Sequence, residues 1–129
     1  MKSIQNVAKE FNVSTRTLRY YEEIGLLKPD RSISNQRTFS KKETTKLKLI
    51  LRGKKYGFSL EEIKEMVLLF DLDRTGIQQL ERTIAYGEQK MIEIDEKIAE
   101  LTQIKSEIQQ LHTLFSEKLT KLKGEMLDE

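Results

Sequence analysis

The fold is decided by a basic stretch near the N-terminus that reads S-T-R-T-L-R-Y-Y-E-E at residues 14–23. Ser14 is a favourable N-cap, because its hydroxyl can accept a hydrogen bond from an amide of the first helical turn. In a helix that begins there, Arg16, Arg19 and Tyr20 share one face, since residues three and four apart are neighbours. Arginine can bind the O6 and N7 atoms of guanine with two parallel donors, so this face suits the major groove of DNA. The stretch predicts a DNA-reading helix, with Ser14 at its start as a further candidate DNA contact, and a solvated face without a ligand is the plain alternative.

Two tyrosines extend this candidate interface. Tyrosine hydroxyls commonly contact phosphate groups, so Tyr20 and Tyr21 are candidates for contact with the DNA backbone. The alternative for Tyr21 is a partly buried position in the core of the head.

A shorter helix is predicted just before this stretch. Ile4, Val7, Ala8 and Phe11 follow helical spacing behind Ser3, which can act as the N-cap. Two short helices separated by a few residues, the second of them carrying several cations, are typical of a helix-turn-helix.

Residues 26–40 are rich in turn-forming residues and predict a small β-hairpin, or wing. Ile33 and Phe39 are isolated apolar residues within it. Arg37 lies two positions before Phe39, so in a strand both side chains point to the same face. We expect Arg37 to contact DNA from this wing, at the backbone or in the minor groove.

Two serine–glutamate pairs predict the beginnings of two further helices. Ser40 with Glu43, and Ser59 with Glu62, have the spacing of a capping box, in which hydroxyl and carboxylate each bind a free amide. The inward-facing residues of these helices are expected to be Leu47, Ile50, Leu51, Ile63, Met66, Val67 and Phe70.

Charge is divided unevenly along the chain, although the net charge is only +2. Residues 1–57 carry 14 Lys and Arg against 5 Asp and Glu, whereas residues 58–129 carry 9 against 16. The basic half is expected to meet a polyanion, with chance clustering as the alternative. Within it, Lys54 and Lys55 lie in a turn between two predicted helices and are candidates for phosphate contact, although exposed lysines need no function.

A polar segment at residues 71–76 separates this head from one long predicted helix. Beyond it proline is absent, and apolar residues recur at intervals of three and four, with Gly87 in one of these positions and a stammer-like break after Leu101. The predicted seam consists of Ile77, Leu80, Ile84, Met91, Ile94, Ile98, Leu101, Ile104, Ile108, Leu111 and Phe115.

A helix with one narrow apolar stripe needs a partner, because a long helix in water gains little stability from propensity alone. A second copy of the chain is the expected partner, and a hairpin folded at the break is the alternative. The predicted fold is therefore mainly α and has three parts. They are a winged helix-turn-helix DNA-binding domain at residues 1–75, a dimerising coiled-coil helix at residues 76–123 and a frayed acidic tail at residues 124–129.

Composition argues against several other classes of protein. Cysteine is absent, which excludes disulfides, thiolate catalysis and thiolate binding of soft metals. The single histidine, His112, is interpreted as a surface residue of the coiled coil, so no metal site, cofactor or enzymatic activity is predicted. No apolar run approaches the roughly 20 residues of a membrane helix, and the N-terminus does not read as a secretion signal, so we expect a cytoplasmic protein.

Four motifs together resemble the MerR family of bacterial transcription regulators. They occur in order through most of residues 3–70 and read T-L-R-Y-Y-E at 17–22, G-L-L at 25–27, R-T-F-S at 37–40 and G-F-S-L-E-E-I at 57–63. The sequence L-K-L-I-L-R-G at 47–53, with G-F-S at 57–59, is most similar to a branch of the family linked to leucine and acyl-CoA catabolism.

The resemblance implies a winged helix-turn-helix head followed by an antiparallel dimer helix. It implies that Arg16 and Arg19 probe the major groove, that Tyr21 binds a phosphate and that Arg37 makes the wing's contact with the backbone. Members of the family bend and untwist promoters so that RNA polymerase can use them. A two-fold dimer would select an inverted repeat. A coiled-coil adaptor whose head binds protein instead of DNA is the rival interpretation.

The resemblance does not identify an inducer. If a small-molecule inducer exists, we expect it at the dimer interface near Phe70, Tyr86 or Phe115.

Overall fold

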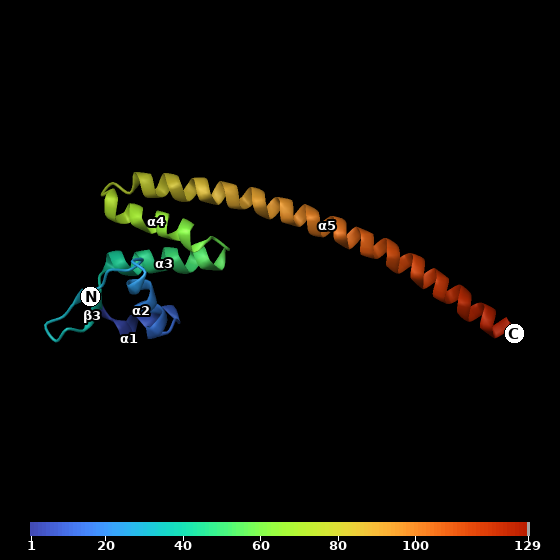
Figure 1. The fold of residues 1–129 in the computed structure, drawn as a ribbon, viewed down its shortest axis with the longest axis horizontal. Coiled ribbons are helices and arrows are strands. Elements are labelled where there is room, and N and C mark those ends of the chain that lie inside the picture. Colours follow the sequence, from blue (N-terminus) through green and yellow to red (C-terminus); the bar gives the residue numbers. More distant parts are fainter. Residues whose placement is uncertain (129) are drawn as a thin grey trace. The chain divides into compact units, whose positions relative to one another are not determined.

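The computed structural model describes residues 1–128 and confirms the predicted fold class, mainly helical with a small sheet. Figure 1 shows the order of the elements along the chain. Their bounds are β1 Lys2–Ser3, α1 Ile4–Phe11, α2 Thr15–Glu23, β2 Asp30–Arg31, β3 Arg37–Phe39, α3 Lys41–Lys55, α4 Leu60–Leu72 and α5 Ile77–Asp128.

The helix-turn-helix consists of α1 and α2, and both predicted N-caps are confirmed. The hydroxyl of Ser3 accepts a hydrogen bond from the amide of Asn6 at 3.2 Å, and that of Ser14 accepts one from Thr17 at 3.0 Å. Between the helices Asn12 adopts the left-handed conformation, with φ 54° and ψ 47°. Asparagine tolerates that conformation better than most residues, which explains the sharp turn at this position.

The predicted wing is present, and it belongs to a sheet of three strands. β2 pairs antiparallel with β3, placing Arg31 opposite Arg37, and β1 pairs with the other edge of β3. The sequence analysis did not predict β1, because a strand of two residues has no alternating pattern to detect.

Serine caps begin α3 and α4, but only one of the two predicted capping boxes forms. Ser59 and Glu62 bind each other's amides at 3.1 and 2.8 Å, as predicted. Ser40 accepts a hydrogen bond from the amide of Glu43 at 3.3 Å, but the carboxylate of Glu43 does not return it. The prediction of a second full box was wrong, because this carboxylate binds the ammonium of Lys46 and the amide of Lys28 instead.

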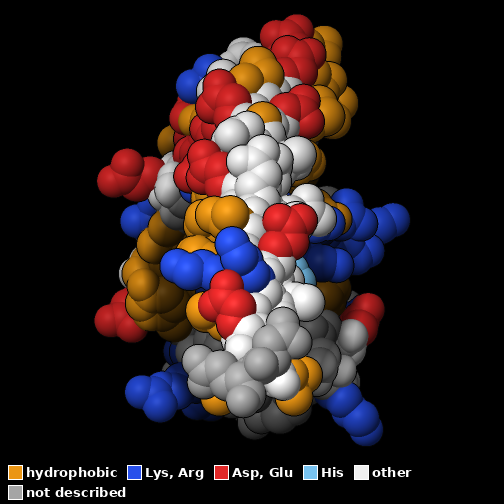
Figure 2. Space-filling view, turned by 90° about the vertical axis from the view of Figure 1, so that its right-hand side faces the viewer, with side chains coloured by type: hydrophobic (Ala, Val, Ile, Leu, Met, Phe, Trp, Pro, Cys, Tyr) orange, Lys and Arg blue, Asp and Glu red, His pale blue; other side chains and the backbone are white. Residues whose placement is uncertain are grey.

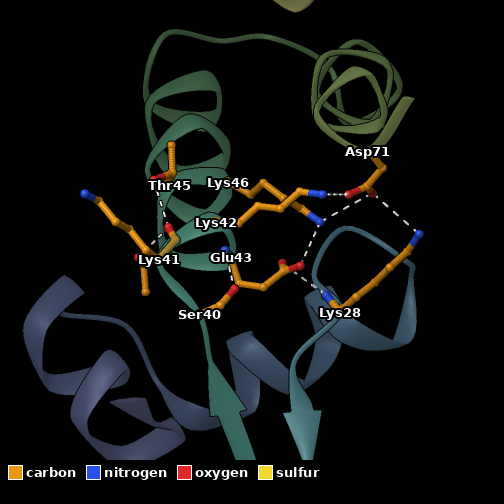
Figure 3. Close-up of polar contacts among 9 residues, drawn as sticks. Lys28, Ser40, Lys41, Lys42, Glu43, Thr45, Lys46 and Asp71 are labelled. Carbon is orange, nitrogen blue, oxygen red and sulfur yellow. Dashed lines mark hydrogen bonds and ion pairs between the residues drawn. The ribbon is translucent and has the colours of Figure 1, made fainter. Parts of the chain in front are cut away.

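Those groups belong to a buried ion cluster that joins three segments of the head (Figure 3). The Lys46 side chain is 0% exposed, and its ammonium donates to Oε1 of Glu43 at 3.1 Å and lies 3.5 Å from Oδ2 of Asp71. Glu43 also accepts a hydrogen bond from the amide of Lys28 at 3.2 Å. The cluster therefore links the loop after α2 with α3 and the end of α4.

Asp71 is the point where three lysines converge. Its oxygens lie 2.8 Å from Nζ of Lys42 and 3.5 Å from Nζ of Lys28, in addition to Lys46. Burial alone would raise the pKa of Asp71, but the hydrogen bond from Lys42 and the charges of Lys46, Lys42 and Lys28 outweigh it and hold that pKa below its ordinary value. Asp71 is therefore ionised in the folded head.

The core of the head lies between α1, α2, α3 and α4. The predicted inward-facing residues Leu51 and Phe70 are only half-buried. The other five, Leu47, Ile50, Ile63, Met66 and Val67, are buried as predicted. Gly53 marks a close approach of α3 and α4, because a Cβ atom at this position would lie 2.8 Å from Cγ1 of Ile63.

The turn between α4 and α5 is closed by Asp73. Its carboxylate accepts hydrogen bonds from the Thr75 hydroxyl at 2.6 Å and from the amides of Thr75 and Gln78 at 3.0 and 2.8 Å. The bond from the Thr75 hydroxyl is the main reason that the pKa of Asp73 is lower than usual. These bonds satisfy amides that the first turn of α5 leaves free.

The compact head includes the first turns of α5. It comprises Met1–Ala85, and a second unit begins at Tyr86. The first turns of α5 pack on the head, since Gln79 is buried and Nε of Arg82 lies 2.6 Å from Oε1 of Glu65 in α4. The functional boundary at residue 75 stays a prediction.

α5 is a single helix of 52 residues, so the alternative of a hairpin folded near Leu101 was wrong. The helix also continues through Gly124 to Asp128, where fraying was predicted, and Glu129 lies outside the described residues. One glycine in a helix costs only about 1 kcal/mol, which is too little to end it among good helix formers. Within residues 1–128 no helix is apolar over a stretch long enough to cross a membrane.

Candidate DNA interface

The exposed face of α2 carries the predicted base-reading residues. Arg16 and Arg19 are exposed, and Tyr20 is 48% exposed beside them. Leu18, on the opposite side of the helix, is fully buried and fixes the orientation of that face. The structure thus brings three of the predicted contact residues onto one accessible surface.

Ser14, also predicted to contact DNA, lies at the beginning of α2. Its hydroxyl caps the helix and lies 2.8 Å from Oγ1 of Thr17. Free amides and the positive end of the helix dipole make such a position favourable for a phosphate. Its DNA contact stays a prediction.

Tyr21 is not on this surface. The residue is 2% exposed, and its hydroxyl is buried without a hydrogen-bond partner among the described residues. A contact between this hydroxyl and a phosphate is therefore not available in the present arrangement. Tyr21 lies on the same side of α2 as Leu18, one turn further along, where the ring fills the core, which is the alternative that the sequence left open. Its contact with a phosphate stays a prediction.

The wing is held to α2 by one carboxylate. Nε of Arg37 lies 3.0 and 3.2 Å from the two oxygens of Glu22, and Nη2 of Arg31 lies 3.3 Å from Oε1 of the same residue. We call the contact of Glu22 with Arg31 and Arg37 the wing clamp. Arg37 was predicted to contact DNA, and in the structure its Nε binds Glu22. Glu22 and Arg31 were not predicted as site residues.

A signal for the clamp was nevertheless present in the sequence. A hairpin over residues 26–40 can place Arg31 directly opposite Arg37, and two like charges in that position repel each other unless an anion lies between them. Glu22 is the anion that the structure provides.

The tip of the wing carries an exposed apolar residue. The amide of Asn35 donates to the carbonyl of Ser32 at 2.8 Å, and the amide of Gln36 donates to the hydroxyl of Ser32 at 3.1 Å. Ile33, between them in the turn, is completely exposed. Hydrogen bonds within the turn hold the tip in this conformation and leave Ile33 in solvent.

The basic C-terminal end of α3 lies near the reading face. Lys54 and Lys55 are exposed, with their ammonium groups 5.7 Å from the ring centre of Tyr21 and 5.9 Å from that of Tyr56. Tyr20 and Lys54 both line a cleft of about 250 Å³. The structure therefore brings the end of α3 to the same side of the head as this part of α2. Contact of the two lysines with DNA stays a prediction.

The predicted dimer seam is exposed along its whole length. All eleven of its residues are between 43 and 60% exposed in the single chain. Figure 2 shows hydrophobic side chains at the surface among acidic and basic ones. No part of the described chain covers this seam.

Comparisons with known proteins agree with this geometry. Residues 2–68 match the family described as "MerR HTH family regulatory protein", and residues 44–111 match the one described as "MerR, DNA binding". The chain is 34% identical over 110 residues to the HTH-type transcriptional regulator HmrR of Rhizobium leguminosarum bv. viciae, covering 84% of this chain and 82% of that protein. It is 36% identical over 110 residues to CueR of Vibrio cholerae serotype O1, covering 84% and 76%.

Solved structures give the same result. HiNmlR, described as a MerR family regulator lacking the sensor domain and bound to promoter DNA, has a TM-score of 0.61 and 28% identity, covering 78% of this chain and 75% of that one. A putative MerR family regulator from Listeria monocytogenes has a TM-score of 0.78 over 99 and 98% of the two chains, and its 22% identity shows the shared fold alone. From its head, its long helix and these relatives, the chain belongs to the MerR family of DNA-binding transcriptional regulators.

Proposed function

We propose that this regulator acts as a homodimer that binds an inverted-repeat promoter operator and distorts it to control RNA polymerase. The observation that carries the proposal is the exposed face of α2, where Arg16 and Arg19 project beside a wing clamped in place by Glu22. The relative HiNmlR, with 28% identity, is described as bound to promoter DNA, which supports the same use of this surface.

The residues take different roles in this proposal. Arg16 and Arg19 read base edges in the major groove, where each arginine can bind a guanine through two donors. Tyr20, Lys54, Lys55 and Ser14 contact the backbone, which fixes position but carries no sequence information. Tyr21 is left out because its hydroxyl is buried. Arg37 positions the wing through Glu22 and reaches the backbone only with the rest of its guanidinium.

Two copies are needed to cover the seam of α5, and a two-fold dimer binds two inverted half-sites. Bending the operator between two heads would change the spacing of promoter elements, and this is how an effect on RNA polymerase is expected to arise.

A small-molecule inducer near Phe70, Tyr86 or Phe115 stays a prediction. A shallow groove of about 430 Å³ between α4 and the start of α5 is lined by none of these three residues. The likeness to the leucine-catabolism branch also stays a prediction.

The test begins with selection of bound fragments from random DNA by the purified chain. Affinity for the selected operator is then measured by fluorescence anisotropy as salt is raised. A DNA-binding head should lose affinity steeply, in proportion to its phosphate contacts. Arg16→Ala should weaken the operator complex by about 1–3 kcal/mol and relax sequence preference, whereas Lys54→Ala should weaken all sequences alike and reduce the salt slope.

Arg74→Ala is the matched control, because this arginine is exposed in the turn between α4 and α5, away from α2. It should leave operator affinity nearly unchanged. An affinity that depends on neither salt concentration nor DNA sequence would favour the coiled-coil adaptor instead.

The effect on RNA polymerase is tested separately, by measuring transcription from the operator promoter in vitro. Shortening the spacer between the promoter elements should make transcription independent of the protein.

A further inference from the structure

Three cations form a straight row on the outward face of α3. Lys41, Lys48 and Arg52 are separated by seven and four positions, so their side chains lie within about 40° of one another around the helix. All three are exposed, and the row contains no acidic residue. Figure 3 shows Lys41 pointing away from the buried ion cluster on the other side of α3. The outward face of α3 is therefore a basic strip about 16 Å long.

The charges of this row are not neutralised within the chain. None of its three side chains forms an ion pair with a carboxylate of residues 1–128. By contrast, carboxylates pair with Lys2, Lys28, Arg31, Arg37, Lys42 and Lys46. Lys48 and Arg52 are one helical turn apart, and like charges in that relation repel each other. An anionic partner would relieve this repulsion, so the row favours one.

The row borders a groove of about 380 Å³ at the N-terminal end of α3. Lys41, Thr44 and Lys48 line the groove from α3. The residues that line it from the N-terminus, α1 and β3 are Met1, Lys2, Glu10, Phe11 and Phe39. The groove therefore combines apolar side chains with the cations of the row at its edge.

The row faces away from the reading face of α2. At the C-terminal end of α3, Lys54 lines a cleft together with Tyr20. Successive residues of a helix are rotated by about 100°, so Lys54 is turned by about 120° from Lys48 and by about 160° from Arg52. A straight duplex bound to α2 therefore leaves the row free for another partner.

We propose that this row and groove bind an acidic segment of RNA polymerase that also carries an apolar side chain. The inference rests on the proposed function, which brings the polymerase to the same promoter. The carboxylates of the segment pair with Lys41, Lys48 and Arg52, and its apolar side chain enters the groove beside Phe11. Control of transcription then includes a direct contact between the two proteins, in addition to distortion of the DNA.

The groove favours a protein segment over a second stretch of DNA. A sugar–phosphate backbone has no side chain that could fill a space lined by Met1 and Phe11, whereas a protein segment has one. Lys55, three positions after Arg52, continues the row to the end of α3, where it is proposed to contact the DNA backbone. A segment bound along the row would therefore lie next to the operator, where the polymerase acts.

A single substitution can neutralise the row without unfolding the head. Thr44→Glu places a carboxylate three positions after Lys41 and four positions before Lys48, which is the spacing of ion pairs that stabilise a helix. Thr44→Gln introduces a side chain of nearly the same size without the charge and is the matched control. Both variants should keep the helicity and the operator affinity of the unaltered chain, because position 44 lies outside the proposed DNA interface.

The experiment measures binding of RNA polymerase holoenzyme, from the organism that encodes the chain, to the protein–operator complex. A labelled operator duplex without the promoter elements is saturated with protein, and polymerase is added while fluorescence anisotropy is followed. The complexes of the unaltered chain and of Thr44→Gln should bind the polymerase, with an affinity that falls as salt is raised. Thr44→Glu should raise the dissociation constant about tenfold, because its carboxylate occupies two of the three cations. The bare duplex measures the affinity of the polymerase for DNA alone.

Equal polymerase affinity for the two Thr44 variants overturns the inference, and so does binding to the unaltered complex that is no tighter than binding to the bare duplex. A loss of operator affinity with a smaller salt slope in Thr44→Glu alone also overturns it and assigns the row to DNA. Transcription in vitro separates the two proposals. If transcription responds equally to both variants, only the direct contact fails, whereas a chain that selects no operator overturns the proposed function itself.

Discussion

Replacing Glu43 by glutamine removes one of two carboxylates that neutralise a fully buried lysine. The ammonium of Lys46 would keep only Asp71, at 3.5 Å, after losing the closer oxygen of Glu43 at 3.1 Å. The glutamine also cannot accept hydrogen bonds from both Lys46 and the amide of Lys28 as well as a carboxylate does. Three lysines would then share the single charge of Asp71.

The expected cost follows from the burial of this cluster. Leaving a buried charge without any partner costs about 3–5 kcal/mol, and the remaining contact with Asp71 reduces that to about 2–4 kcal/mol. Glu10→Gln is the matched control, because Glu10 also pairs with a lysine, Lys2 at 2.5 Å, but both side chains are nearly half exposed. An exposed pair contributes less than about 1 kcal/mol.

Urea unfolding of the full chain at fixed protein concentration measures both variants. The chain has no tryptophan, and three of its four tyrosines, Tyr20, Tyr21 and Tyr56, lie in the head, so tyrosine fluorescence reports mainly on head unfolding. Adding Lys46→Met to Glu43→Gln should restore stability, since it removes the uncompensated charge. Equal and small losses in Glu43→Gln and Glu10→Gln would refute the view that the cluster is energetically buried.

Three further outcomes are expected. Gly53→Ala should destabilise the head by about 1–2 kcal/mol in the same urea assay, because the new Cβ would lie 2.8 Å from Cγ1 of Ile63; no change would mean that the two helices can separate freely. The ionised Asp71 contributes to the free energy of unfolding above its unfolded pKa of 3.8, and this contribution is lost as pH falls through its lower folded pKa. The free energy of unfolding of Asp71→Asn should therefore fall less steeply with pH than that of the unaltered chain below about pH 4. Glu22→Gln should lower operator affinity in anisotropy measurements even though it removes a negative charge near DNA; an increase would show that the wing clamp does not position the wing.

Local signals predicted the elements of the head well. Ser3, Ser14 and Ser59 were identified as caps because a capping hydroxyl binds an amide within three residues, so the whole interaction lies in a short stretch of sequence. The exposed face of Arg16 and Arg19 was predicted for the same reason, since helical periodicity alone fixes which residues share a face.

Interactions between distant segments were not predicted. Glu43 has the spacing of a capping-box residue, yet its carboxylate binds Lys28 and Lys46 instead, because those contacts also neutralise a buried charge. Tyr21 has the chemistry of a phosphate contact, but the packing of its ring decided its position. Such choices depend on which segments meet in the folded head, and periodicity carries no information about that.

The contact of Glu22 with both Arg31 and Arg37 also bears on how binding preference can change during evolution. A single carboxylate on the base-reading helix sets the placement of the hairpin, so a substitution that alters one of these elements also disturbs the other. The sequence preference of the base-reading helix, for the centre of a half-site, and that of the wing, for its flank, would therefore tend to change together. Independent tuning of the two would first require a substitute anion for the pair of arginines.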